Sequence, residues 1–209
     1  GLNPITYGEE NSLSINGPVT GNSPYLAFEW RAGKEGEFHQ VHTRLIGEYN
    51  FPNALAAVTI GHFFGVEAEK IDKALNEYEP RNNRSQLKKT ADNTRIIDAY
   101  NANPTSMLAA IGNFRNMQAE KKMLILGDMR ELGKDSAEEH QRIVDYLEEY
   151  GFEDVILVGE LFAATRHTYT TYPDAPALIA ALQKNKPCGK TILIKSTNGI
   201  KLNTVVDYL

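Results

Sequence analysis

After residue 80 the chain alternates between short, uninterrupted apolar runs and longer segments with helical periodicity. We expect strands at residues 94–99, 123–126, 154–158 and 191–194. Apolar runs without alternation are typical of parallel strands that are covered on both faces. Helices are expected at about residues 105–117, 136–150 and 175–183, with a last helix after Gly199. Because strand–helix–strand connections are right-handed, this pattern predicts an α/β fold with a Rossmann-like, doubly wound, mostly parallel sheet.

Residues 1–80 have a different sequence pattern, with short segments separated by Gly, Pro and Asn. Strands are expected at residues 12–16, 25–31 and 38–45, and helices at about residues 52–64 and 67–78. In the second segment Leu26, Phe28 and Trp30 occupy every second position, which is the signature of a half-buried strand. Pro80 and the polar pair Asn82–Asn83 then form a hinge. The sequence thus predicts two domains, a small α+β part at residues 1–80 and the doubly wound domain at residues 81–209.

Composition limits the class of partner. The formal net charge of -5 over 209 residues argues against a nucleic-acid surface, which needs a basic stripe. The single cysteine, Cys188, cannot form an internal disulfide, which is typical of a reducing, cytoplasmic compartment, and it is expected to be an incidental loop thiol. No apolar run approaches the roughly 20 residues that a membrane helix needs, and no signal peptide precedes the first strands.

Polar residues gather where the four predicted strands of the second domain end. These residues are Asp98–Asn103, Gly127–Met129, Gly159–Glu160 and Lys195–Gly199. Ligands of open parallel sheets bind beyond the carboxyl ends of the strands, so these four segments predict one shared site. Ordinary turn chemistry is the alternative for any one of them.

Asp98 is the sharpest candidate, because an acid at the end of an apolar strand costs free energy unless it is paired or used. Its carboxylate can accept hydrogen bonds from ribose hydroxyls. Asn101 and Asn103 follow it, and either one can cap the next helix, with Pro104 at the first helical position. Capping is the interpretation we favour for Asn103, although the same side chain could also contact a ligand.

Three residues outside that sheet edge are also candidates. Asn50 and Asn53 flank the start of a helix, where their amides can either cap it or match the donor and acceptor edge of adenine. Arg84, in the hinge, can reach a phosphate or be an ordinary surface arginine.

His39 and His42 would point to opposite faces of a strand, so no metal site is expected. His140 is expected to be a surface or cap-adjacent residue.

Several of these segments together resemble the Mur ligase family. Residues 47–57 (GEYNFPNALAA) are similar to its G-x-H-N-x-x-N-A-L-A-A segment. Residues 98–107 (DAYNANPTSM) and 126–133 (LGDMRELG) resemble the D-x-Y-N-A-N-P-x-S-M and L-G-D-M-x-E-L-G signatures of the branch that adds D-alanyl-D-alanine, and His140 matches a downstream family histidine. Residues 6–8 resemble a strand late in the family's ATP-binding domain. The likeness therefore spans nearly the whole chain.

The resemblance implies an ATP- and Mg²⁺-dependent amide ligase of peptidoglycan precursor synthesis in the cytoplasm. Its small-molecule substrates would be UDP-N-acetylmuramoyl-tripeptide and D-alanyl-D-alanine, joined through an acyl phosphate, and the protein would be a monomer. Asn50 and Asn53 would contact adenine, and Arg84 and Asp98 would contact ribose and phosphate. Asn101, Asn103, Lys195 and Asn198 are the candidates for the acceptor side. Residues 1–80 would be the end of the ATP-binding domain, and residues 81–209 the C-terminal domain.

The sequence departs from the family pattern at three positions. Tyr49 stands where the family has a histidine, Ser196 replaces the glycine of K-G-S, and Asn83 precedes Arg84 where the family has Gly-Arg. No G-x-x-x-x-G-K-[ST] phosphate loop occurs in the chain. We therefore expect a C-terminal fragment of a longer enzyme, without a catalytic residue or turnover of its own. The alternatives are another Mur-type or folylpolyglutamate-type ligase, or a non-catalytic nucleotide-binding module.

Overall fold

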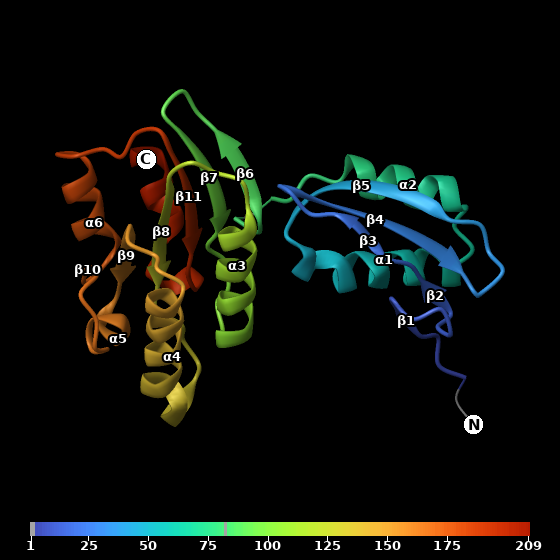
Figure 1. Cartoon of the computed structure of the whole chain (residues 1–209), viewed down its shortest axis with the longest axis horizontal. Helices are drawn as coiled ribbons and strands as arrows, with labels where there is room; N and C mark the ends of the chain where they lie inside the picture. The colour runs from blue at the N-terminus through green and yellow to red at the C-terminus, as the bar shows by residue number, and fades with distance from the viewer. Residues whose placement is uncertain (1–2, 82) are drawn as a thin grey trace. The chain divides into compact units, whose positions relative to one another are not determined.

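The computed structural model describes residues 3–81 and 83–209 of the chain. It divides into two compact units, Gly1–Pro80 and Arg81–Leu209. Asn82, which the sequence places in the hinge, lies outside the described residues. Each unit has its own core, and each is described by itself below (Figure 1).

The first unit is a small sheet with two helices. Its elements are β1 (Tyr7–Gly8), β2 (Ile15–Asn16), β3 (Val19–Gly21), β4 (Tyr25–Ala32), β5 (His39–Ile46), η1 (Glu48–Asn50), α1 (Phe51–Phe63) and α2 (Ala68–Glu77). The strand order in the sheet is β1-β2-β4-β3, and β5 pairs with β4 in the antiparallel direction. Leu26, Phe28 and Trp30 are buried, which confirms the period-two pattern. The strand predicted at residues 12–16 is wrong in extent, because only Ile15 and Asn16 pair with β4.

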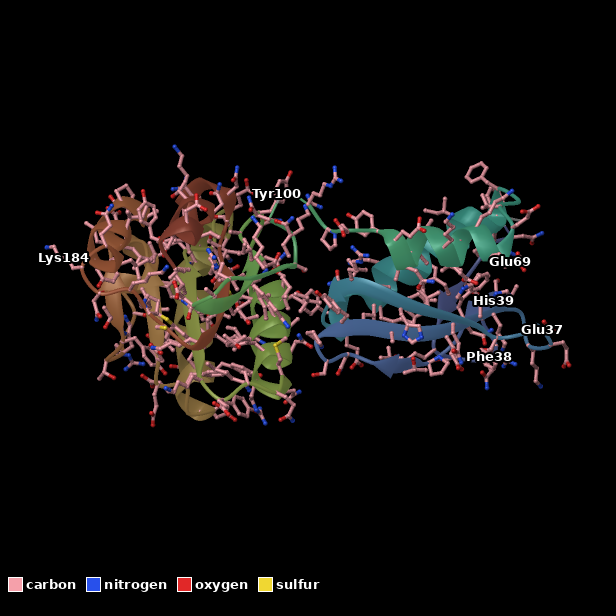
Figure 2. The ribbon with its side chains drawn as sticks, turned by 90° about the horizontal axis from the view of Figure 1, so that it is seen from above. Glu37, Phe38, His39, Glu69, Tyr100 and Lys184 are labelled. Carbon is pink, nitrogen blue, oxygen red and sulfur yellow. The ribbon has the colours of Figure 1, made fainter. Side chains whose placement is uncertain are left out.

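A half-buried carboxylate ties α2 to the strands of the first unit. Asp72 of α2 accepts a hydrogen bond from Trp30 Nε1 at 2.7 Å through Oδ1, and its Oδ2 lies 3.0 Å from His39 Nδ1. The His39 ring stacks on Trp30 with 4.7 Å between centroids. The His39 ring thus contacts both Asp72 and Trp30 at one end of the sheet, where Figure 2 labels it.

The second unit has a six-stranded sheet in the order β10-β9-β8-β11-β7-β6. Its strands are β6 (Gln86–Lys89), β7 (Asn93–Asp98), β8 (Lys122–Gly127), β9 (Val155–Val158), β10 (Thr170–Tyr172) and β11 (Lys190–Lys195). Only β6 is antiparallel to its neighbour; the other pairs are parallel. The predicted doubly wound, mostly parallel α/β fold is therefore confirmed. The edge strands β6 and β10 were not predicted, because their polar sequences carry no apolar run.

Helices cover both faces of this sheet (Figure 1). They are α3 (Pro104–Asn116), η2 (Gly133–Asp135), α4 (Ser136–Glu149), α5 (Glu160–Ala163), α6 (Ala175–Leu182), η3 (Asn198–Ile200) and η4 (Leu202–Tyr208). One core is formed by α6 and η4 against alternate strand residues such as Ile125 and Ile194. The intervening residues Leu124 and Leu193 point the other way and are also buried, on the side of α3 and α4. The last helix predicted after Gly199 is present as two 3₁₀ helices, η3 and η4.

The last strand, β11, lies between β7 and β8, the first two parallel strands of the unit. The chain leaves β7 and β8 through α3 and α4, whereas it leaves β11 through η3 and η4, which cover the opposite face. Where the connections from neighbouring strands run over opposite faces, the sheet has a topological switch point, and open α/β sheets bind ligands there. No helix among the residues that the structure describes is both long and apolar enough to cross a membrane.

Candidate active-site edge of the second unit

The carboxyl ends of β9, β8, β11 and β7 lie along one edge of the sheet, as predicted, and those of β8, β11 and β7 meet at the switch point. Lys195, the last residue of β11, is in register with Asp98 of β7 on one side and with Leu126 of β8 on the other. The segments that follow these strands therefore line one edge of the sheet. We refer to this set of residues, 98–103, 127–131 and 195–199, as the carboxyl rim.

Asp98 and Lys195 form an ion pair within the rim. Lys195 Nζ lies 2.6 Å from Asp98 Oδ2 and 3.4 Å from the carbonyl oxygen of Asn101. The side chain of Lys195 is only 2% exposed and that of Asp98 13% exposed. None of the hydrogen bonds among the described residues uses Oδ1 of Asp98. The lysine thus fixes the carboxylate and leaves one oxygen for a ligand hydroxyl.

The segment after β7 is held by capping and by the β11 loop. Asn103 caps α3, accepting from Ser106 N at 2.8 Å, and Ser106 Oγ accepts in return from the Asn103 N–H at 3.1 Å. The capping interpretation of Asn103 is therefore confirmed. Asn198 N donates to Tyr100 O at 3.0 Å, and the side chains of Asn101 and Asn198 are exposed.

Arg84 and Tyr100 form a cation–π pair beside the rim. The Arg84 guanidinium carbon lies 3.9 Å from the Tyr100 ring centroid, and Tyr100 is exposed at the surface of the second unit (Figure 2). Asn83, before Arg84, has φ 59°, a left-handed conformation that glycine adopts freely and that asparagine tolerates better than most residues. Asn83 is thus a chemically suitable substitute for the glycine of the family's Gly-Arg pair.

Asp128 and His140 form a buried cluster that the sequence interpretation missed. Asp128 accepts hydrogen bonds from Leu161 N at 3.0 Å and Phe162 N at 2.9 Å, which fixes the start of α5. His140 Nδ1 lies 2.6 Å from Ser136 O, and its Nε2 accepts from Met129 N at 3.0 Å. These two bonds require the neutral imidazole with its proton on Nδ1.

The expectation that His140 lies at the surface is wrong, because the residue is 0% exposed. A signal was present in the sequence. His140, Ile143, Val144 and Leu147 follow the i, i+3, i+4, i+7 spacing of one buried helix face.

Ser196 fits the rim because Gly127 has no side chain. A Cβ added to Gly127 would lie 2.7 Å from Ser196 Cβ. Ser196 is fully buried, and its Oγ has no hydrogen-bond partner among the described atoms. Serine therefore occupies the family's glycine position by using the space left at Gly127, at the cost of an unsatisfied hydroxyl.

The candidates of the first unit lie around the start of α1. Asn50 gives no side-chain cap to α1; its Nδ2 donates to Ile46 O at 2.8 Å instead. Asn53 is exposed, and its Nδ2 lies 3.5 Å from Asn50 Oδ1. Tyr49 lies half-buried in η1. The capping alternative is wrong for Asn50, and the exposed Asn53 amide is available to a ligand.

A cavity lies at the opposite edge of the sheet, where the strands begin. It has a volume of about 920 Å³ and its lining includes Lys190, Cys188 and Tyr169. Burial, with a smaller effect of the Glu148 charge, raises the pKa of Tyr169. Lys190 is already paired with Asp154. Since parallel sheets bind ligands at their carboxyl ends, we assign the site to the carboxyl rim rather than to this cavity.

The rim thus presents a positioned carboxylate, exposed amides and a stacked guanidinium, a donor and acceptor set suited to a nucleotide and a small polar acceptor. Among the described residues, no group of three or more His, Cys, Asp or Glu side chains could hold a metal ion.

Comparison with known proteins adds the family. A family model described as "Mur ligase, glutamate ligase domain" matches residues 83–198. The chain belongs to the Mur ligase family. This Mur ligase chain is 35% identical over 176 residues to the UDP-N-acetylmuramoyl-tripeptide--D-alanyl-D-alanine ligase of Bacillus subtilis, a match that covers 79% of the chain and 38% of that enzyme.

Solved structures agree with the Mur ligase assignment. The crystal structure of MurF from Acinetobacter baumannii has a TM-score of 0.78 at 25% identity, covering 97% of this chain and 46% of that one. MurF from Thermotoga maritima, solved in complex with ADP, has the same fold, with a TM-score of 0.79 at 16% identity. The Mur ligase chain thus spans less than half the length of these relatives.

Proposed function

We propose that this chain contributes the nucleotide-facing and acceptor-facing residues of an ATP-dependent ligase that adds D-alanyl-D-alanine to UDP-N-acetylmuramoyl-tripeptide. The Asp98–Lys195 pair at the carboxyl rim carries the proposal, because Asp98 begins the D-A-Y-N-A-N-P segment and Lys195 fixes its carboxylate with one oxygen open. The printed name of the Bacillus subtilis relative supports this substrate pair. The peptide carboxylate would take the γ-phosphoryl group of ATP, and the dipeptide amine would then displace phosphate to form the amide.

On the nucleotide side, Asp98 Oδ1 would accept hydrogen bonds from ribose hydroxyls, and Arg84 would face phosphate. Asn53 and Asn50 would read the adenine edge, with Asn53 the more available because Asn50 Nδ2 already donates to Ile46 O. The ADP complex of the Thermotoga maritima relative supports a nucleotide ligand. The exposure of Asn53 and Arg84, and the Asp98 oxygen that Lys195 leaves open, support this assignment to ATP.

On the acceptor side, Asn101 and Asn198 would contact the dipeptide, since both side chains are exposed at the rim. Lys195 and Asn103 would act through position, because Lys195 holds Asp98 and Asn103 caps α3. In this proposal, residues 1–80 are the end of the ATP-binding domain and residues 81–209 are the C-terminal domain. The enzyme would work as a cytoplasmic monomer with Mg²⁺, whose ligands we do not assign to the chain.

An acceptor assay tests the proposal directly. The protein as its gene encodes it should form ADP in the presence of UDP-N-acetylmuramoyl-tripeptide only when D-alanyl-D-alanine is added. Glutamate, L-alanine and diaminopimelate serve as competing acceptors. Preference for one of these would replace the proposal with another Mur-type ligase, and ADP formation with folate and glutamate would indicate the folylpolyglutamate type. Nucleotide binding without ligation of any acceptor would indicate a non-catalytic module.

A second assay uses the 209-residue chain alone. It should give no acyl phosphate and no ADP, because its sequence contains no phosphate loop. Acyl phosphate trapped with hydroxylamine from this chain alone would contradict the expectation that these 209 residues have no turnover of their own.

A further inference from the structure

Arg130 lies at the switch point, and none of the ion pairs among the described residues includes it. It follows Met129 in the loop after β8, and its side chain packs on Gly199 in the loop after β11. A Cβ added to Gly199 would lie 2.9 Å from Arg130 Nη1, 3.0 Å from Cζ and 3.2 Å from Nε. Three nearly equal distances show that the flat face of the guanidinium lies against Gly199.

This contact leaves the donors of Arg130 unused. The five N–H groups of a guanidinium lie in its plane, so a contact through the face does not consume them. None of the ion pairs formed among residues 3–81 and 83–209 includes Arg130, and the residue is exposed. Of the other charged rim residues, Lys195 pairs with Asp98 and Asp128 binds two backbone N–H groups. Glu131, next to Arg130, is exposed and takes part in none of the ion pairs of the described residues.

The backbone on both sides of Arg130 is fixed. His140 Nε2 accepts the Met129 N–H at 3.0 Å on one side. On the other side Glu131 has φ 67°, a conformation that costs a non-glycine residue about 1 kcal/mol or more. Thr197 Oγ1 donates to Asp128 O at 3.1 Å and so ties the β8 loop to the β11 loop. The guanidinium is therefore held on a rigid base rather than on a free loop.

We propose that Arg130 binds the terminal carboxylate of the acceptor; this rests on the proposed ligase function and names a further residue of its site. A planar, unpaired guanidinium at a switch point matches a carboxylate through two parallel hydrogen bonds. The ATP phosphates are the other oxyanions of the reaction. The acceptor is favoured because Arg130 packs against Gly199, the neighbour of Asn198, and Asn198 is assigned to the dipeptide in the proposed function. Asp98, assigned to ribose, ends β7, on the other side of β11 from β8 and the Arg130 loop.

The test compares an acid with its amide in the protein as its gene encodes it. Wild type should use D-alanyl-D-alanine at least about 10-fold better, in kcat/KM, than D-alanyl-D-alaninamide. Arg130→Ala should raise the KM for the acid by about 10- to 100-fold, leave the KM for ATP within about threefold, and bring the ratio of acid to amide close to one. Arg130→Lys should retain part of the preference, because it keeps the charge but loses the paired geometry.

Arg142→Ala is the matched control, since Arg142 is an exposed arginine on α4 that pairs with Glu139. It should behave as wild type, and all three variants should unfold at the wild-type temperature. An unchanged KM for the acid in Arg130→Ala, an equal loss with the amide, or an effect on ATP alone would overturn the assignment. If wild type ligates a different amino acid, the proposed function fails, and the same acid and amide comparison with that amino acid decides the role of Arg130.

Binding to the 209-residue chain gives a readout without turnover. Titration with D-alanyl-D-alanine should shift the amide resonance of Gly199 and the Nε–H resonance of Arg130, and the amide analogue should not. Equal shifts with both compounds, or none with either up to tens of millimolar, would count against the proposal.

Discussion

The ammonium group of Lys195 and the carboxylate of Asp98 lie 2.6 Å apart, although 97 residues separate them along the chain. Both side chains are largely enclosed, so removal of one partner leaves the other as a buried, uncompensated charge. The same pair joins two strands that become neighbours only in the folded sheet.

Lys195→Met should lower the free energy of unfolding by about 3 kcal/mol in urea denaturation, because Asp98 loses its counter-charge. The double variant Lys195→Met with Asp98→Asn should recover at least half of that loss, since it removes both charges. Lys186→Met is the matched control, because its pair with Asp92 is exposed and screened by solvent and should contribute much less to stability. Equal effects at the two lysines would contradict the argument from burial.

His140→Leu should lower the free energy of unfolding by about 2–4 kcal/mol, because the Met129 N–H loses its acceptor in a buried place. The ring also packs edge-on against Phe162, with 4.7 Å between centroids. Glu138→Ala, on the exposed side of the same helix, should change stability by no more than about 0.5 kcal/mol. Hydrogen exchange gives the specific readout, since the Met129 amide should lose protection relative to its neighbours in β8.

Gly159→Ala should be among the most damaging small substitutions in the chain. A Cβ there would lie 2.2 Å from Asp128 Cγ, and the residue has φ 121°. Crowding and backbone strain together predict a loss of more than about 2 kcal/mol in thermal or urea unfolding. Gly151→Ala has a positive φ of 68° but meets no atom within 4 Å, so its cost, about 1 kcal/mol, isolates the strain alone. Similar losses at the two glycines would show that crowding at Asp128 is absent.

The Asp92–Lys186 pair predicts a pH dependence of stability. The hydrogen bond from Lys186, followed by its charge, lowers the pKa of Asp92 below its ordinary value of 3.8. A lowered folded-state pKa means that the contribution is fully present above the unfolded pKa and is lost as the pH falls through the folded pKa. The stability difference between wild type and Asp92→Asn should therefore be constant above about pH 5 and shrink below about pH 4. Lys186→Met should abolish this trend.

The sequence predicted the second unit well because its central strands are buried on both faces. Such strands are continuous apolar runs, and their order in the chain fixes the crossovers. The edge strands β6 and β10 were missed for the opposite reason: half-exposed strands such as Gln86–Lys89 keep polar residues that look like loop. The packing of η4 in one core with α6 is a tertiary contact that local propensity does not report.

Chain order alone was enough to predict which residues lie at the same sheet edge, whereas the contacts that depend on long-range pairing could not be predicted from it. The gathering of Asp98, Lys195 and Asn198 at one edge follows from the parallel sheet. That Lys195 would neutralise Asp98 rather than face a ligand requires the insertion of β11 beside β7, which no local pattern reveals. His140 was misplaced because the charged residues around it masked its helical spacing with Ile143, Val144 and Leu147.

The central position of β11 has a consequence for how the second unit is made on the ribosome. Residues 190–195 pair with both β7 and β8, so those earlier strands have no permanent neighbour between them until β11 has been synthesised. Pairing across such long sequence separations is slow, because loop closure precedes the contacts that compensate it. The nascent unit must therefore emerge almost entirely before its sheet can close, and a ribosome stalled shortly before residue 190 should hold a chain that proteases still cut between β7 and β8.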